Sequence, residues 1–106
     1  MAQFDVHRNT GRHRETIPYV VVVQSSMYDG YRRRVVVPLA DKALLGAVSD
    51  GGFNPSFTIE NSEVVLHPLE IVSIPKEQLG PWVASLAEEG EAILQALDQL
   101  LSRTWQ

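Results

Sequence analysis

Two apolar runs rich in β-branched residues limit the folds open to this chain. The first, at residues 19–24 (YVVVVQ), is apolar at successive positions, which indicates a strand covered on both faces. The second, at residues 33–37 (RRVVV), precedes Pro38, and we expect the strand to end there because proline has no N–H to give to a ladder. The Asp29-Gly30 pair between the runs is a turn signal. The chain is therefore built around short strands.

Further strands are indicated before and after these runs. Residues 3–7 alternate weakly and predict a short first strand, which a polar loop follows. Residues 55–68 predict a hairpin, because β-branched and apolar residues flank a polar tip at 60–63. Residues 69–75 predict one more short strand, closed by Pro75.

Two helical segments are indicated. Residues 40–52 predict a short helix or helical turn that Gly51-Gly52 breaks. From Pro81 the apolar period changes to three and four residues, which predicts an amphipathic helix to about Arg103, with Pro81 in its first turn and Gly90 weakening its middle. The apolar stripe of this helix consists of Trp82, Leu86, Ile93, Leu97, Leu100 and Leu101.

Five or six antiparallel strands followed by one C-terminal helix predict an all-β or α+β barrel-like fold, with residues 1–106 as a single domain. A chain of this length with 44% hydrophobic residues builds only a small core. A central strand that is apolar on both faces leaves surface that one copy cannot cover. We therefore expect a symmetric homodimer.

Composition argues against several classes of protein. The chain has no cysteine, which excludes disulfides and thiolate metal sites. It has no apolar segment of the roughly 20 residues that cross a bilayer, and its N-terminus lacks the apolar core of a secretory signal. The net charge of -4 disfavours direct binding of nucleic acid. We expect a soluble cytoplasmic protein that contacts neither membrane nor nucleic acid.

No residue pattern indicates an enzyme or a cofactor. His7, His13 and His67 lack the spacing of metal ligands, and no nucleophile motif or phosphate loop is present. The Arg32-Arg33-Arg34 triplet has two interpretations. In the first, the arginines form a ribonuclease-like cluster that stabilises a phosphorane. In the second, they mark the exposed start of a strand, and alternation along that strand turns Arg33 to the face opposite Arg32 and Arg34. We favour the strand start, because no acid or base lies at a readable spacing.

Several motifs keep a common order along the chain. VVVQS at residues 21–25 is followed by Asp29, by RRVVVPLA at residues 33–40 and by Leu44-Leu45. The motifs that come later are Pro55, Ile59, Ser73-Ile74-Pro75 and the terminal helix. In this order and spacing the whole chain resembles the CcdB family of plasmid-addiction toxins.

The resemblance implies a fold and a function. Members of this family are homodimers of an SH3-like β-barrel with a C-terminal helix. They bind the A subunit of DNA gyrase and trap it on cleaved DNA without being enzymes, and a CcdA-like antitoxin with a disordered tail neutralises them. MazF-type ribonuclease toxins share this fold, so a ribonuclease is the alternative function. A further alternative is a non-toxic paralogue that only binds an antitoxin.

The resemblance also places the gyrase contact on two segments. The loop after VVVQS carries Ser25, Met27 and Tyr28, of which Ser25 matches the family's serine. The C-terminal end of the helix is the second segment, and the positions that it contributes are Asp98, Leu101, Arg103, Trp105 and Gln106.

The C-terminus departs from the family's pattern. Active members end in Trp-Gly-Ile, whereas Trp105 lies three residues later in an alignment without gaps and is followed only by Gln106. Three residues correspond to about 4.5 Å along a helix. Arg103 also adds positive charge near a target contact that is rich in arginine. The hypothesis is therefore a CcdB-type toxin with weakened or altered poisoning of gyrase.

Overall fold

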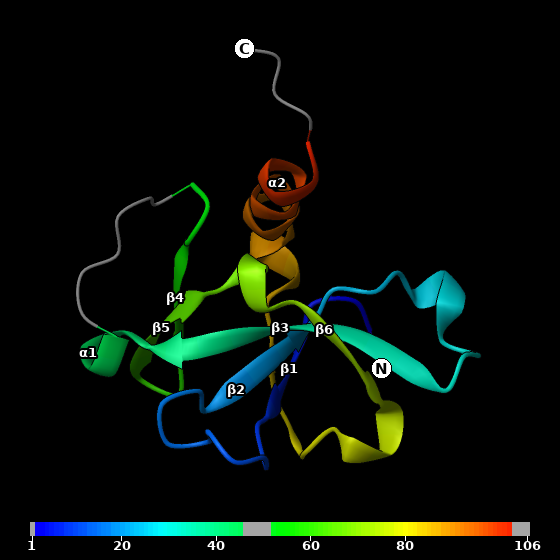
Figure 1. The fold of residues 1–106 in the computed structure, drawn as a ribbon, viewed down its shortest axis with the longest axis horizontal. Coiled ribbons are helices and arrows are strands. Elements are labelled where there is room, and N and C mark those ends of the chain that lie inside the picture. The colour runs from blue at the N-terminus through cyan, green and yellow to red at the C-terminus, as the bar shows by residue number, and fades with distance from the viewer. Residues whose placement is uncertain (1, 46–51, 103–106) are drawn as a thin grey trace.

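The structure is a computed structural model that describes residues 2–45 and 52–102. One antiparallel sheet of seven strands curls into a half-barrel, with α2 at the C-terminal end (Figure 1). The strands are β1 (Asp5–Arg8), β2 (Tyr19–Val22), β3 (Arg33–Asp41), β4 (Ser56–Ile59), β5 (Ser62–Leu66), β6 (Val72–Pro75) and β7 (Trp82–Ser85). The helices are α1 (Lys42–Leu45) and α2 (Gly90–Leu101), with short 3-10 turns η1 (Ser26–Tyr28), η2 (Pro68–Glu70), η3 (Lys76–Gln78) and η4 (Ala87–Glu89).

This architecture confirms the predicted barrel-like α+β fold. The strand order is β4-β5-β3-β2-β1-β7, and β6 pairs with β3 beside this path. One face of the sheet packs against α2, which contributes Ile93 and Ala96 to the core. Burial of each large apolar side chain stabilises the fold by roughly 1.5–3 kcal/mol. The core side chains that the strands contribute include Val6, Val21, Val37, Leu39, Val64 and Leu66.

Strand β3 continues through Pro38, and the prediction that it ends there was wrong. Its first half pairs with β6, from Arg33 opposite Pro75 to Val36 opposite Val72, and its last three residues pair with β5. The carbonyl of Pro38 accepts a hydrogen bond from the His67 N–H at 3.1 Å, and His67 directly follows β5. The nitrogen of Pro38 therefore faces the side of β3 on which β5 and β6 lie. Because β3 changes neighbours there, the missing N–H of Pro38 interrupts no ladder.

The predicted hairpin is present as β4 and β5. Its tip is shorter than the expected four residues, because Ser62 already pairs with Ile59. The two tip residues, Glu60 and Asn61, have φ of 51° and 66°. Positive φ at both central positions defines a type I′ turn, whose twist matches that of the flanking strands.

The predicted helix from Pro81 was wrong in its first third. Trp82–Ser85 forms β7, which pairs with β1, and α2 begins only at Gly90. The helical period was misleading because pairing with β1, which no local pattern reports, makes these residues a strand. The seventh strand was hidden in this segment.

Phe4 fixes where α2 begins. The Phe4 backbone has a left-handed φ of 72°, its N–H donates to the Val22 carbonyl at 2.6 Å, and its carbonyl accepts from the Leu86 N–H at 2.9 Å. A Cβ at Gly90 would lie 2.5 Å from Cε2 of Phe4, so the first residue of α2 rests directly on this ring. Gly90 therefore allows this close approach and does not weaken the middle of a helix.

The remaining predicted elements are present in shorter form. A short helix lies within residues 40–52 as α1, whereas Gly51 is outside the described residues. The strand predicted for residues 69–75 occupies only β6, because η2 precedes it. No helix among residues 2–45 and 52–102 is long and apolar enough to cross a membrane.

Candidate functional site

The residues that the sequence assigns to target binding fall on two elements. Ser25, Met27 and Tyr28 lie together on the loop from β2 to β3. Asp98 and Leu101 lie three residues apart in the last turn of α2, which places them on the same side of the helix. The other three assigned positions, Arg103, Trp105 and Gln106, are outside the described residues.

Ser25 shapes the loop as the N-cap of η1. Its Oγ accepts a hydrogen bond from the Met27 N–H at 3.2 Å, and its carbonyl accepts from the Tyr28 N–H at 3.0 Å. Both apolar side chains that follow point into solvent, with Met27 84% and Tyr28 50% exposed. The Tyr28 ring meets that of Tyr31 edge to face, with 5.9 Å between centroids. The turn therefore presents a small apolar and aromatic surface.

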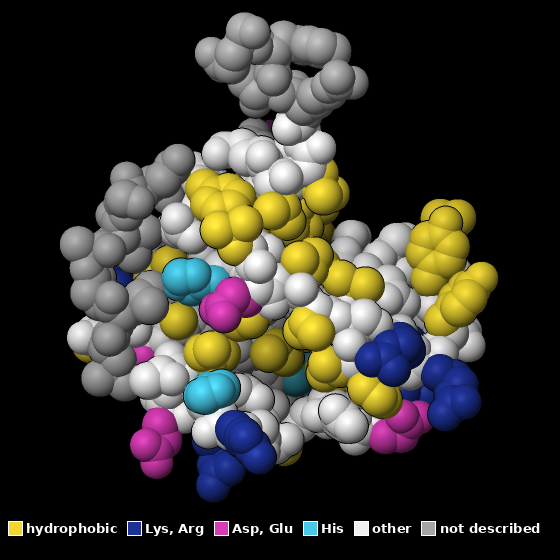
Figure 2. Space-filling view, in the orientation of Figure 1, with side chains coloured by type: hydrophobic (Ala, Val, Ile, Leu, Met, Phe, Trp, Pro, Cys, Tyr) yellow, Lys and Arg dark blue, Asp and Glu magenta, His cyan; other side chains and the backbone are white. Residues whose placement is uncertain are grey.

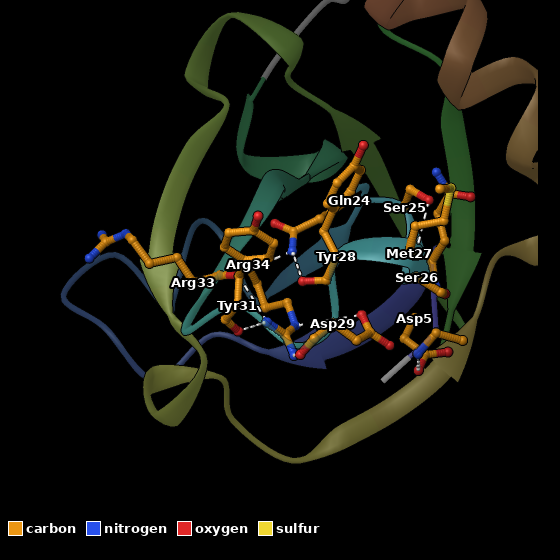
Figure 3. A network of polar contacts seen from close by, with 12 residues as sticks. Asp5, Gln24, Ser25, Ser26, Met27, Tyr28, Asp29, Tyr31, Arg33 and Arg34 are labelled. Atoms are coloured by element: carbon orange, nitrogen blue, oxygen red, sulfur yellow. Dashed lines mark hydrogen bonds and ion pairs between the residues drawn. The ribbon is translucent and has the colours of Figure 1, made fainter.

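Gln24 holds the two ends of this loop together. Its Nε2 donates to the carbonyls of Tyr28 and Arg33 at 3.1 and 3.2 Å, and its Oε1 accepts from the Val35 N–H at 3.0 Å (Figure 3). One side chain thus links the end of η1 to the start of β3.

Arg34 is buried beneath the same loop, with only 3% of its surface exposed. Its Nη1 donates to the carbonyls of Tyr31 and Arg33 at 2.6 and 2.9 Å, and its Nη2 donates to the carbonyl of Asp29 at 2.7 Å (Figure 3). The Asp29 carboxylate lies 3.9 Å from its Nε. The interpretation of the triplet as an exposed strand start is wrong for Arg34, because the loop's carbonyls converge on its guanidinium.

The other two arginines of the triplet are exposed. The predicted alternation holds for Arg33 and Arg34 within β3, whereas Arg32 precedes the strand and is exposed like Arg33. Arg33 donates from Nε to Ser73 Oγ at 2.8 Å and from Nη2 to the Ser73 carbonyl at 2.7 Å. Arg33 therefore lies along β6, and its guanidinium is held in a fixed position at the edge of the loop.

The last turn of α2 is also a surface feature. The Ser102 N–H donates to the Asp98 carbonyl at 2.7 Å and closes this turn. The side chain of Asp98 is exposed, and Leu101 is 79% exposed. Leu101 therefore gives the end of α2 an exposed apolar side chain.

The three histidines are separate from these two elements. His7 is buried, and its Nδ1 lies 2.9 Å from the Gly80 carbonyl, whereas the ring of His67 is half-buried. Within the described residues, the Nε2 atoms of both rings are buried without a hydrogen-bond partner. His13 is exposed on the loop after β1. In the described part of the chain, no three His, Asp or Glu side chains come together as a metal site.

A groove on the outer face of the sheet was not predicted. It has a volume of about 620 Å³ and lies between the loop after β1 and η3. Val20, Val36 and Ile74 line it together with Arg8 and Arg12.

The residues missed on the β2–β3 loop are Gln24 and Tyr31, and the only signal for them was their place directly beside the apolar runs.

Solved structures share this fold over nearly its whole length. One is an endoribonuclease in complex with its cognate antitoxin from a mycobacterial species, with a TM-score of 0.72, 14% identity, and coverage of 100% of this chain and 99% of that one. Another is the Mycobacterium tuberculosis toxin MazF-mt6, with a TM-score of 0.71, 15% identity, and coverage of 95% and 99%. At these identities the likeness establishes the fold alone.

Sequence comparison gives the family. No curated protein sequence is significantly similar to this chain. The family model for the CcdB protein matches residues 3–102, which is almost the whole chain. The chain belongs to the CcdB family, a family of toxins from toxin–antitoxin systems.

Proposed function

We propose that this protein is the toxin of a type II toxin–antitoxin system that acts as a homodimer on the A subunit of DNA gyrase. It traps gyrase on cleaved DNA by binding and is not itself an enzyme. Membership of the CcdB family over residues 3–102 carries this proposal. The geometry of Ser25, which turns Met27 and Tyr28 outward, gives the family's serine position a physical role.

The arrangement of the arginines supports binding over catalysis. Arg34 is buried and directs its N–H groups to three backbone carbonyls. A ribonuclease would need such a guanidinium to face a phosphate. The alternative function is a MazF-like ribonuclease, because this chain shares its fold with two solved toxins.

The C-terminal end of α2 and the residues after it form the other half of the proposed contact. Leu101 offers exposed apolar surface there, and Trp105 would add an indole, whose cation–π attraction to a target arginine is about 0.5–2 kcal/mol. Because Trp105 comes three residues late and Arg103 adds positive charge, we infer weakened or altered poisoning. Asp98 and Gln106 complete this proposed surface.

Expression in a host with sensitive gyrase tests the proposal, together with gyrase-mediated DNA cleavage by the purified components. Trp105→Ala is compared with Trp82→Ala, since Trp82 on β7 is the other tryptophan of the chain and its side chain is exposed. Killing that only Trp105→Ala abolishes identifies the shifted indole as the effector. Killing by both variants shows that Trp105 is not required.

A ribonuclease assay separates the two candidate functions. We expect gyrase-dependent DNA cleavage and no RNA cleavage from the wild-type protein. RNA cleavage without gyrase dependence, lost in Arg12→Gln or Arg33→Gln, would replace the proposal with the ribonuclease. If the protein kills by neither route but binds the product of the neighbouring reading frame, it is the non-toxic, antitoxin-binding paralogue.

A further inference from the structure

The turn that carries the proposed target contact has little packing of its own. η1 is three residues long, and none of them is buried. Tyr31, which follows in the same loop, is 66% exposed, and Figure 2 shows hydrophobic side chains gathered at the outer end of this loop. A segment with few buried apolar contacts opens at a low cost in free energy unless other contacts hold it closed.

Arg34 provides such contacts from beneath the loop. Its guanidinium donates to the carbonyls of Asp29 and Tyr31 at 2.7 and 2.6 Å, and to the carbonyl of Arg33 at 2.9 Å. Asp29 directly follows η1 and Arg33 begins β3, so one rigid plane joins the end of the turn to the start of the strand. Hydrogen bonds from a charged donor are roughly twice as strong as those between neutral groups.

The charge of Arg34 is only partly paired. Burying a charged group is unfavourable unless it is paired and hydrogen-bonded, and a well-packed apolar side chain in its place is often neutral or stabilising. The Asp29 carboxylate lies 3.9 Å from Nε of Arg34, which is too long for a hydrogen bond, and among the described residues this Nε has no hydrogen-bond partner. Arg34 therefore serves the shape of the loop more than the stability of the sheet.

Gln24 reinforces the same stretch of backbone. Its Nε2 donates to the carbonyls of Tyr28 and Arg33, and the second of these carbonyls also accepts from Arg34 (Figure 3). The two side chains together bind the carbonyls of residues 28, 29, 31 and 33. Because the loop is held by its backbone acceptors, its own apolar side chains remain exposed to a partner.

We propose that Arg34 is a positioning residue for the target contact, which keeps Met27 and Tyr28 in the orientation that binds the target without touching the target itself. This role rests on the proposed function, because the contact that Arg34 positions is the one assigned there to gyrase. An ordered loop loses little conformational freedom on binding, so the contact forms at a lower entropic cost. If the binding-competent loop falls to a tenth of the population, the apparent affinity falls about tenfold.

Arg34→Lys tests the geometry at constant charge. Lysine keeps the positive charge but has no planar fork that spans several carbonyls. We expect binding to the gyrase A subunit to weaken by roughly tenfold, with the sheet still folded by far-UV circular dichroism. Hydrogen exchange should become faster at the amides of residues 28, 29 and 31, which are hydrogen-bonded within the loop.

Arg32→Lys is the matched control. It makes the same chemical change two residues away, at a side chain that is exposed where that of Arg34 is buried. We expect Arg32→Lys to change the affinity by less than about twofold, as is usual for an exposed charge at constant sign. Equal weakening by Arg32→Lys and Arg34→Lys would mean that the guanidinium groups of this loop touch the target, and it would refute the positioning role.

Gly30→Ala separates ordering of the loop from other effects of the substitution. Gly30 lies between the two residues whose carbonyls Arg34 holds most closely, its φ is outside the left-handed region, and an added Cβ would meet nothing within 4 Å. Alanine restricts the free loop without a clash. In the Arg34→Lys background, Gly30→Ala should restore affinity by roughly twofold or more, whereas in wild type it should change little. Absence of any restoration in the folded double variant overturns the proposal.

A second variant covers the case in which Arg34→Lys does not fold. Gln24→Ala then takes its place, because it removes the links from the same backbone to Tyr28 and Arg33. The same weakening of gyrase binding and the same faster exchange are expected. A folded variant of either kind that binds gyrase as tightly as wild type refutes the positioning role.

Hydrogen exchange also distinguishes this proposal from the proposed function, since it needs no target. If wild type does not bind the gyrase A subunit while exchange in the Arg34→Lys loop is faster, the proposed function is refuted and the ordering of the loop by Arg34 is retained. If wild type binds gyrase while exchange in Arg34→Lys equals that of wild type, the proposed function is retained and the positioning role is refuted.

Discussion

The hydroxyl of Tyr19 donates a hydrogen bond of 2.6 Å to Oε1 of Glu60. Arg8 joins the pair, with Nη2 at 3.0 and 3.1 Å from the two Glu60 oxygens and its guanidinium carbon 5.7 Å from the centre of the Tyr19 ring. These contacts attach the tip of the β4–β5 hairpin to β1 and β2. The hairpin is thus held at its tip as well as along β5.

This cluster predicts a pH-dependent stability. The hydrogen bond from Tyr19, followed by that from Arg8, lowers the pKa of Glu60 below its ordinary value of 4.5. The ionised carboxylate therefore stabilises the folded state above pH 4.5, and this contribution is lost as the pH falls through the lowered pKa. Thermal unfolding of Glu60→Gln should differ from wild type most at neutral pH and converge with it in acid.

Glu63→Gln is the control for this effect. Glu63 lies on the same hairpin and carries the same charge, but its ion pair with Lys42 is longer, at 3.7 Å, and its side chain is more exposed. We expect a smaller difference in melting temperature for Glu63→Gln. A Glu60→Gln variant whose difference from wild type stays constant from neutral pH into acid would contradict the role of the carboxylate.

A second prediction concerns the base of α2. Gly90→Ala places a Cβ 2.5 Å from the Phe4 ring, so the ring or the helix has to shift. Such overpacking costs typically about 1–3 kcal/mol. Chemical denaturation measures the loss, and Gly30→Ala is the control because nothing lies within 4 Å of its added Cβ. Equal stability of Gly90→Ala and wild type would mean that Phe4 does not fix the start of the helix.

The hairpin tip predicts a stabilising substitution. Asn61 has φ of 66°, where glycine is at no steric disadvantage, and the second position of a type I′ turn favours glycine. Asn61→Gly should raise the free energy of unfolding by a few tenths of a kcal/mol, whereas Asn61→Val should lower it by about 1–2 kcal/mol. A more stable valine variant would show that the turn has another conformation.

The homodimer is tested by mass. Exposed apolar side chains on separate elements, including Leu69 on η2 and Leu94 on α2, provide surface for a second copy. Light scattering at micromolar concentration should give about twice the chain mass of 11.8 kDa. A mass of one chain at that concentration rejects the dimer.

The strands were predictable where the pattern is local. The valine run of β2 and the β4–β5 hairpin depend on neighbours in the sequence, and both are present, the hairpin with a tip of two residues where four were expected. Pro38 and Trp82 were misread because long-range pairing determines their structure. Pro38 is tolerated since β3 exchanges β6 for β5 at that point, and Trp82 is in a strand since β1 offers an unpaired edge.

The candidate site was predictable only in part. The order of motifs identified Ser25, Met27 and Tyr28, which the structure places on one exposed turn. Nothing in the sequence distinguished Arg34 from Arg32, because burial of one arginine depends on the path of a loop whose carbonyls converge on it. Sequence patterns report side-chain polarity, whereas this loop is organised by backbone acceptors.

The pairing of β1 with β7 joins the first strand of the chain to the last. During synthesis, β1 emerges from the ribosome with one edge unpaired and keeps it so until nearly the whole chain has been translated. The Phe4 ring likewise packs against Gly90 only after residue 90 has been synthesised, and the start of α2 is positioned on the sheet at that stage. The α2 end of the proposed contact is therefore completed only when nearly the whole chain has been translated, long after the β2–β3 loop has its partners.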